Sequence, residues 1–562
     1  MLRKPSVFRK MGLLPLLVFL STLTPPVVAS TIPATTQRKA QTIRWVDCHD
    51  KVPDGLGDEL NATNGVFTGT IPPNLFCGEM DVPMDYTKPF DAATNNITIG
   101  FAMNRPAKRA QGLILYHAGG PGQNAALQPW AHAFNVTGGG LAINVEGLDD
   151  FDFLAVNVRG IQLSNPLNIT SGVFFNNLPF AFPSTQDEFD QYQAAMKNFY
   201  AAATRDSTPP GIMNFVGSKD VVQDWDAMRA ALGYDKVSLA VVSYGTFPGL
   251  EYATRFPNRV DKFVLDASIP HGMPYQDMVS FQVGAANRLV QRADAFCLID
   301  PTCPFHGQGN GSVVKAWQTV LAQGIKAPLA APSCGPGKGC NSPVTATDLR
   351  QGVPAILRAN PDFPSFNIAL NESLHGDASG FAFQPQFDIR ETVLSPLLCS
   401  DMKLDDDIKT FKGWNALNLA SEDPLSIRYS QIWQMLLMCV SWPFGAAEHT
   451  TLPTDLEIMW MTSDFDLNLP TELTTFSWQL TPKSTLVIRH GDDHTSLPNI
   501  GPSAAAGDIA RNFLRTGVMP GSRSDAQVTI IPPGDKRLPI PGAYDVPTGA
   551  IAGDESIVEN IV

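Results

Sequence analysis

The chain has 562 residues, of which 44% are hydrophobic and 17% charged, a composition typical of a globular protein rather than a disordered one. Its formal net charge of −14 argues against nucleic acid and anionic membranes as partners, because both repel an acidic surface. The length exceeds the usual size of one domain, so we expect one large core with an inserted lobe, or two domains.

Residues 1–30 have the three-part pattern of a signal peptide. Four basic residues lie before or at the start of the apolar run 11–20, and Val28-Ala29-Ser30 provides a cleavage site of small residues. The apolar run is shorter than the roughly 20 residues of a membrane-spanning helix, so we expect cleavage and secretion rather than a stable membrane anchor. Removing the four basic residues would change the net charge to −18.

All eight cysteines follow this leader, and an even number in an oxidising compartment predicts disulfide bonds. Neighbours in the sequence are the simplest partners, although other pairings are possible. A metal site is less favoured, because the spacings contain no repeated CxxC pair, and we expect no metal and no cofactor. The suggested pairs are Cys48–Cys77, Cys297–Cys303, Cys334–Cys340 and Cys399–Cys439.

Six segments match the Asn-X-Ser/Thr acceptor pattern for N-glycosylation. Any one of them could occur by chance, but six on a chain with a leader favour a glycosylated eukaryotic secretory protein. The acceptors are Asn61, Asn96, Asn135, Asn168, Asn310 and Asn371.

The part 31–272 has the pattern of a core. Strand patterns at 43–48, 75–89 and 96–103 predict opening antiparallel strands. A buried strand pattern at 112–117 then ends in the loop Gly119-Gly120-Pro121-Gly122. An ordinary turn is one interpretation, and a phosphate-binding loop is not favoured because no Gly-Lys-Ser/Thr follows. The N–H groups of Gly119 and Gly120 are candidates for binding an oxyanion, because glycines let the backbone approach a substrate closely.

Strand patterns near 152–157, 236–242 and 261–266 alternate with helical patterns at 185–204 and 220–232, as in parallel βαβ units.

The strand pattern at 236–242 breaks at Ser243 and resumes as a helix. A buried serine at a strand end is often only a core hydroxyl. A strand-to-helix elbow would instead expose its oxygen as a nucleophile and aim the N–H of Tyr244 at the reacting carbonyl. Gly245 provides one small flanking residue, but Val241 stands where a glycine is usual.

From 273 to 445 the pattern changes, with six cysteines, a Gly/Pro-rich segment at 331–340 and helical runs such as 430–438. We expect an inserted, mostly helical, disulfide-linked lid, and a loose excursion of the core is the alternative. The core resumes over 446–520 with strands near 456–463 and 484–490 and a helix at 504–517. An irregular tail is expected over 521–562.

Ionisable residues follow both late strands, and the carboxyl ends of parallel strands gather at one edge, where they can meet Ser243. The chain order Ser243, Asp466, His494 is the order of a nucleophile, acid and base in α/β-hydrolases. We prefer His494 to His490, because His494 stands in a polar turn whereas His490 belongs to the strand end. Asp464 is the alternative to Asp466.

From about residue 43 to 520 the chain resembles the secreted tripeptidyl/proline aminopeptidase branch of the α/β-hydrolases. The resemblance implies a mostly parallel central sheet with helices on both faces, the acid at Asp466, four residues before Pro470, and the base at His494. It also implies lid carboxylates that receive a free amino terminus, for which Glu372, Glu391 and Asp401 are candidates. The segments that carry the resemblance are 77–86, 119–122, 159–160, 164–166, 243–246, 256–261, 466–470, 494–496 and 513–520.

The chain also departs from this branch. Val241 replaces the glycine of the elbow, Asn157 replaces an aspartate, and Gln162 replaces a glycine. The cysteines that commonly flank the final helix in the branch are absent.

We therefore expect a secreted serine hydrolase that acts as an exopeptidase on peptides with a free amino terminus. Its acyl-enzyme would form at Ser243, and the oxyanion hole would use the N–H of Tyr244 and that of Gly119 or Gly120. One alternative is an esterase or amide hydrolase of small molecules, such as those of secondary metabolism. Another is an inactive binding protein, in which Val241 prevents the elbow from forming.

Overall fold

The computed structural model describes residues 42–63, 65–136, 144–169, 182–335, 340, 342–382, 389–449, 452–497, 505–519 and 528–531. These residues belong to one compact unit. The segment expected to be a signal peptide, 1–30, lies outside them. Among the described helices, none combines the length and the apolar character that a membrane crossing requires.

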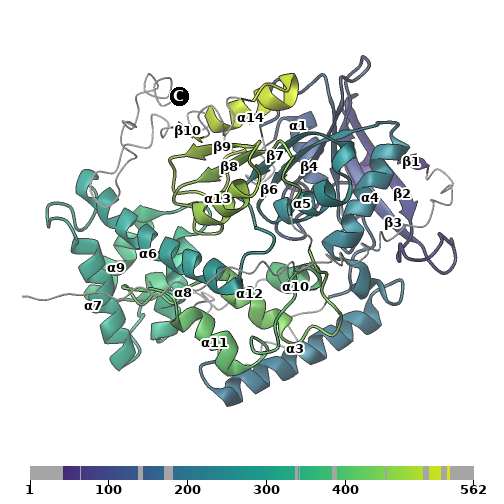
Figure 1. Ribbon diagram of the computed structural model, residues 1–562. Helices are drawn as coiled ribbons and strands as arrows, with labels where there is room; N and C mark the ends of the chain where they lie inside the picture. Colours follow the sequence, from purple (N-terminus) through teal and green to yellow (C-terminus); the bar gives the residue numbers. More distant parts are fainter. Residues whose placement is uncertain are drawn as a thin grey trace, which may run out of the picture. The chain divides into compact units, whose positions relative to one another are not determined.

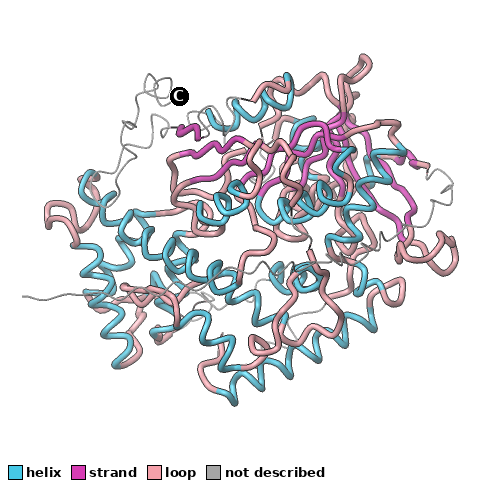
Figure 2. Tube along the Cα trace, in the orientation of Figure 1, coloured by secondary structure: helices cyan, strands magenta, loops and turns pink. Residues whose placement is uncertain are grey.

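The described strands form one ten-stranded sheet in the order β1-β2-β3-β5-β4-β6-β7-β8-β9-β10 (Figure 2). The strands at the β1 end pair antiparallel as far as the β3–β5 pair, and all pairs from β5–β4 to β9–β10 are parallel. The predicted mostly parallel sheet is therefore confirmed. The strands are β1 (Ile43–Val46), β2 (Leu75–Val82), β3 (Ile97–Asn104), β4 (Leu113–His117), β5 (Asp152–Val156), β6 (Val237–Val242), β7 (Val260–Asp266), β8 (Met459–Ser463), β9 (Thr485–Arg489) and β10 (Val528–Ile531).

Helices cover both faces of the sheet (Figure 1). On one face lie α1 (Leu127–Phe134) and α14 (Ala505–Thr516). On the other lie α4 (Ser218–Ala231), α5 (Thr246–Arg255) and α13 (Thr471–Gln479). Because the central strands are buried on both faces, they appear in the sequence as continuous apolar runs rather than as alternating ones.

The described residues between β7 and β8 form helices and loops (Figure 2), and many of them pack in a separate apolar core. A second apolar cluster joins the later lid helices to α3 (Gln186–Asp206), where Phe189 packs against Phe411 and Trp414. The helical layer thus also includes α3, which precedes the expected interval 273–445. Its other helices are α6 (Tyr275–Ile299), α7 (Ser312–Lys326), α8 (Ala346–Leu357), α9 (Phe363–Leu374), α10 (Ile389–Asp401), α11 (Phe411–Leu419) and α12 (Gln431–Cys439).

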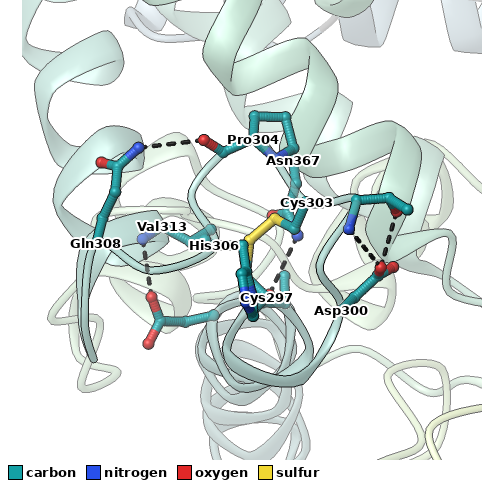
Figure 3. The surroundings of a disulfide bond; sticks show 11 residues. Cys297, Asp300, Cys303, Pro304, His306, Gln308, Val313 and Asn367 are labelled. Carbon is teal, nitrogen blue, oxygen red and sulfur yellow. Dashed lines mark hydrogen bonds between the residues drawn. A yellow bond between two sulfur atoms is a disulfide. The ribbon is translucent and has the colours of Figure 1, made fainter.

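The eight cysteines form four disulfides, in the pairs suggested by their proximity in the sequence. Figure 3 shows the bond between Cys297, in the last turn of α6, and Cys303 in the following loop. Nδ1 of His306 donates to the carbonyl oxygen of Cys297 at 3.0 Å, so the short loop is also closed by a hydrogen bond.

The described part of the tail that was expected to be irregular, residues 528–531, is a strand. Val528-Thr529-Ile530-Ile531 forms β10, which pairs in parallel with β9 at the edge of the sheet. All four residues are β-branched, and such side chains favour the extended backbone of a strand.

A buried ion pair links two of the segments that carry the family resemblance, 77–86 and 159–160, to α4. The Arg159 guanidinium is fully buried and makes two hydrogen bonds of 2.7 Å to the Asp224 carboxylate on α4. It also donates to the carbonyl oxygen of Met84, and Tyr86 donates to the same Asp224. Arg159 therefore joins the segment after β2 to α4, and its role is structural.

Val241 packs toward α5, the helix that follows Ser243. A Cβ atom placed on Gly249 of that helix would lie 2.8 Å from Cγ2 of Val241, closer than packed carbon atoms normally approach. The elbow thus accommodates a valine at 241 because the facing helix position has no side chain.

This complementarity predicts that Gly249→Ala destabilises the protein. Overpacking typically costs about 1–3 kcal/mol, more than the roughly 1 kcal/mol that alanine gains over glycine within a helix. In the Val241→Ala background the clash is removed, so Gly249→Ala should no longer destabilise. Thermal midpoints of the four proteins would measure this coupling, and additive effects would contradict it.

Candidate active site

Ser243 lies at the turn between β6 and α5, with a φ of +55° that non-glycine residues rarely adopt. The turn packs tightly against the end of β4. A Cβ atom on Gly245 would lie 2.7 Å from Nδ1 of His117 and 2.8 Å from its carbonyl oxygen, so a larger residue at 245 does not fit. The strand-to-helix elbow therefore forms in spite of Val241.

Ser243, His494 and Asp466 come together at the carboxyl edge of the sheet. Nε2 of His494 lies 2.9 Å from Oγ of Ser243, and its Nδ1 lies 2.6 Å from Oδ2 of Asp466. Asp466 is fully buried, and its Oδ1 accepts hydrogen bonds from the N–H groups of Asn468 and Leu469, at 2.8 and 3.1 Å. The carboxylate is thus fixed on both oxygens, and the imidazole bridges it to the serine.

The alternative acid and base pair with each other. Nδ1 of His490 lies 2.6 Å from Oδ2 of Asp464, and Oδ1 of Asp464 accepts the N–H of Gly491 at 2.9 Å. The structure therefore contains two neighbouring Asp–His pairs, and the pair that contacts Ser243 is Asp466 with His494.

The electrostatic surroundings of His494 favour its charged form. Burial by itself lowers the pKa of this imidazole, but the charge and hydrogen bond of Asp466 outweigh burial, and Asp266 adds to their effect. The net result is that the pKa of His494 is raised above its ordinary value of 6.5. An imidazole with a raised pKa is a stronger base toward the serine proton.

Asp266 is a positioning residue that the sequence reasoning missed. It ends β7 next to Val242, and its buried Oδ2 accepts the N–H groups of Ser496 and Leu497 at 2.5 and 2.6 Å. These bonds hold the loop that carries His494. The signal available in the sequence was an acidic residue at the carboxyl end of a buried strand.

The glycine loop after β4 lies directly against the elbow. A Cβ atom on Gly119 would lie 2.8 Å from Cβ of Ser243 and 3.1 Å from the nitrogen of Tyr244. The Gly119 N–H donates to Nδ1 of His117 at 3.0 Å, and burial lowers the pKa of His117 to about 4, which keeps the ring neutral and able to accept. Because Gly119 is engaged in this way, the N–H groups of Gly120 and Tyr244 remain as the candidates for an oxyanion hole.

The lid contacts both loops of the triad. Phe465 and Leu467, which flank Asp466, are buried in the apolar cluster of α6 to α9. The N–H of His494 donates to the carbonyl oxygen of Ala359, just after α8, at 2.8 Å. In addition, Arg292 of α6 forms a buried ion pair with Asp492. The lid thus supports the acid and the base from one side.

The three candidate lid carboxylates have different surroundings. Asp401 is buried and accepts hydrogen bonds from the N–H and Oγ of Ser218, at 2.8 and 2.5 Å, and from the Tyr244 hydroxyl. It therefore ties α10 to α4 and to the elbow and is not open to a substrate amine. Glu372 is exposed on α9, and the side chain of Glu391 lies outside the described residues.

The two other departures from the family pattern have local roles. The fully buried Asn157 accepts the N–H of Ala126, at the start of α1, through Oδ1 at 3.0 Å. Gln162 has a φ of +29° and contacts Asn124. The positive φ explains why a glycine is usual at this position.

Four of the six predicted glycosylation acceptors are exposed, and the other two, Asn96 and Asn371, are partly buried. The exposed ones are Asn61, Asn135, Asn168 and Asn310.

Near the elbow, the buried Glu251 and His271 and the partly buried His449 form the group within the described residues that could hold a metal ion. No spacing in the sequence predicted it, because the lid separates His271 from His449.

Two family models match the chain: the alpha/beta hydrolase fold over residues 112–318 and the TAP-like protein family over residues 424–526. The tripeptidyl aminopeptidase of Streptomyces lividans is 25% identical over 389 residues, which cover 66% of this chain and 68% of that protein. Serine protease Hip1 of Mycobacterium tuberculosis is 27% identical over 256 residues, or 45% and 46% of the two chains. The putative hydrolase YuaR of Escherichia coli is 25% identical over 295 residues, or 50% and 52%.

The first family match spans the elbow and the second spans Asp466 and His494. Together with the sheet order, the two family matches show an α/β-hydrolase fold, and the similarity to these relatives supports a TAP-like branch of it.

Proposed function

We propose that this protein is a secreted serine exopeptidase that removes short peptides or single residues from a free amino terminus. The observation that carries the proposal is the continuous hydrogen-bonded chain from Oγ of Ser243 through His494 to the buried Asp466. The tripeptidyl aminopeptidase and serine protease relatives support a peptide substrate, and the four disulfides support an oxidising compartment.

In the first half of the reaction, Nε2 of His494 takes the proton of Ser243 as Oγ attacks the scissile carbonyl carbon. Asp466 accepts a hydrogen bond from the Nδ1–H of His494, which fixes the tautomer and stabilises the imidazolium that forms. The N–H groups of Tyr244 and Gly120 would donate to the oxyanion. The intermediate then collapses, and His494 gives its proton to the departing amine.

In the second half, His494 takes a proton from water, and the hydroxide attacks the acyl-enzyme. The second tetrahedral intermediate releases the acid product and returns the proton to Ser243. The same steps hydrolyse an ester, so the triad alone does not choose between peptide and ester substrates. The choice depends on the lid, which surrounds the triad loops.

Substitution of Ser243 tests the nucleophile. We expect a fluorophosphonate probe to label the wild-type protein covalently and to leave Ser243→Ala unlabelled, with hydrolysis reduced by about 10⁴-fold or more. Ser238→Ala, on the same strand, is the matched control and should keep its label. A folded wild-type protein that does not react would overturn both enzyme interpretations and favour a binding protein.

A substrate panel tests the peptidase assignment. Chromogenic tripeptidyl and aminoacyl amides should be cleaved with a higher kcat/KM than simple esters of small acids. Blocking the amino terminus of the same peptides should abolish their cleavage. If the labelled enzyme cleaves only esters, or cleaves blocked and free peptides equally, the exopeptidase proposal fails while the serine hydrolase mechanism stands.

The pH profile tests the role of Asp466. The base must be neutral to accept the serine proton, so kcat/KM should fall as the pH drops through the raised pKa of His494. In Asp466→Asn the charge that raises this pKa is gone. The acidic limb should therefore move to lower pH, and activity should fall on the order of 10⁴-fold.

Asp464→Asn is the control, because Asp464 pairs with His490 instead. Its acidic limb should coincide with that of the wild type. A shift caused by Asp464→Asn and not by Asp466→Asn would reassign the acid.

A further inference from the structure

A cluster of three potential metal ligands lies next to α5, the helix that follows Ser243. Its members are Glu251, His271 and His449, from three segments that the fold brings together. Glu251 is on α5, His271 follows β7, and His449 is in the segment that returns from the lid to the core. The Glu251 and His271 side chains are buried, at 8% and 6% exposure, and one potential ligand atom of each of the three residues lies within 4.8 Å of the others.

Both histidines have their Nε2 atoms next to backbone carbonyl oxygens. Nε2 of His271 lies 3.1 Å from the oxygen of Phe247, and Nε2 of His449 lies 2.9 Å from that of Asp401. A carbonyl oxygen only accepts, so each ring carries a proton on Nε2. When a ring is neutral, its Nδ1 then carries the lone pair that can bind a metal ion. Metal-binding histidines typically show this arrangement, with the second nitrogen donating to a carbonyl or carboxylate.

Nδ1 of His271 is buried and has no hydrogen-bond partner among the described residues. An unsatisfied buried polar atom is unfavourable, so this nitrogen lacks a ligand or a donor. The ring centroids of His271 and His449 lie 4.7 Å apart.

The distance from Nδ1 of His449 to Oε2 of Glu251 is 3.2 Å. Without an ion this contact is a hydrogen bond in which a protonated Nδ1 of His449 donates to the carboxylate, and binding of an ion would displace that proton. The same distance fits two ligands of one ion, because metal–ligand bonds of about 2.0–2.1 Å at tetrahedral angles place ligand atoms roughly 3.3 Å apart.

We propose that Glu251, His271 and His449 form a binding site for a divalent transition-metal ion, with Zn²⁺ as the expected occupant. Two imidazoles and one carboxylate suit zinc better than calcium or magnesium, which prefer oxygen ligands. The ion would be held by Nδ1 of both histidines and by a carboxylate oxygen, and water would complete its coordination.

The role of the bound ion would be to stabilise the folded protein, not to take part in hydrolysis. Both histidine rings pack edge-on against Phe247 of α5, at 4.3 and 4.5 Å, and Phe247 stacks on Tyr244. An ion there would join the elbow helix, the segment after β7 and the return from the lid. A ligand that binds only the folded state stabilises it, so the ion should raise the thermal midpoint.

The experiment uses the full chain, stripped with a chelator and titrated with Co²⁺, which reports tetrahedral nitrogen and oxygen ligation by its visible absorption. We expect saturation at one equivalent, displacement by Zn²⁺, and a lower thermal midpoint in the stripped protein. His271→Gln and Glu251→Gln should each weaken binding by at least about 100-fold. His375→Gln, at an exposed histidine after α9, is the matched control and should bind normally.

Glu251→Gln retains the size of the side chain and its contact with His449, so it separates loss of the ligand from loss of the fold. Wild-type protein that still reacts with the active-serine probe but binds neither Co²⁺ nor Zn²⁺ saturably would overturn the proposal. Equal binding by the wild type and both glutamine variants would overturn it as well. Neither result depends on the outcome for the exopeptidase proposal.

Discussion

The left-handed backbone at Ser243 is the constraint on which the site depends. A non-glycine residue in this conformation costs about 1–3 kcal/mol, so packing around it has to hold it there. Gly119 and Gly245 allow that packing, since a Cβ atom on either would collide with the elbow or with His117. The glycine loop, the end of β4 and the elbow therefore form one close-packed unit that carries the proposed nucleophile and the proposed oxyanion donors.

Parallel pairing does the rest of the positioning. Val242 at the end of β6 is paired with Asp266 at the end of β7, and Asp266 in turn holds the loop of His494. The acid follows β8, which is the next strand in the sheet. Ser243 thus meets Asp466 and His494, which follow it by 223 and 251 residues in the sequence, because their strands end at one edge of the sheet.

The sequence predicted the sheet, the four disulfides and a choice of triad residues, because each depends on local signals. Buried strands, short cysteine spacings and polar turns after strands are visible in one segment at a time. It did not predict β10, the packing of α3 against the lid, the role of Asp266, or the cluster of Glu251, His271 and His449. These depend on contacts between distant segments, and no spacing within one segment records them. The fit between Gly249 and Val241 was not predicted either, because it depends on α5 packing against β6.

The lid contacts the loops that carry Asp466 and His494, so it is structurally coupled to the candidate active site. Phe465 and Leu467 hold the loop of Asp466 in the apolar core of the lid. The carbonyl oxygen of Ala359 accepts a hydrogen bond from the N–H of His494. Asp401 of α10 accepts a hydrogen bond from the hydroxyl of Tyr244, the residue whose N–H would bind the oxyanion. A change in the lid that altered substrate selection would therefore also move the acid, the base or the oxyanion donor. If the protein is the proposed exopeptidase, the same contacts couple its substrate selectivity to its turnover.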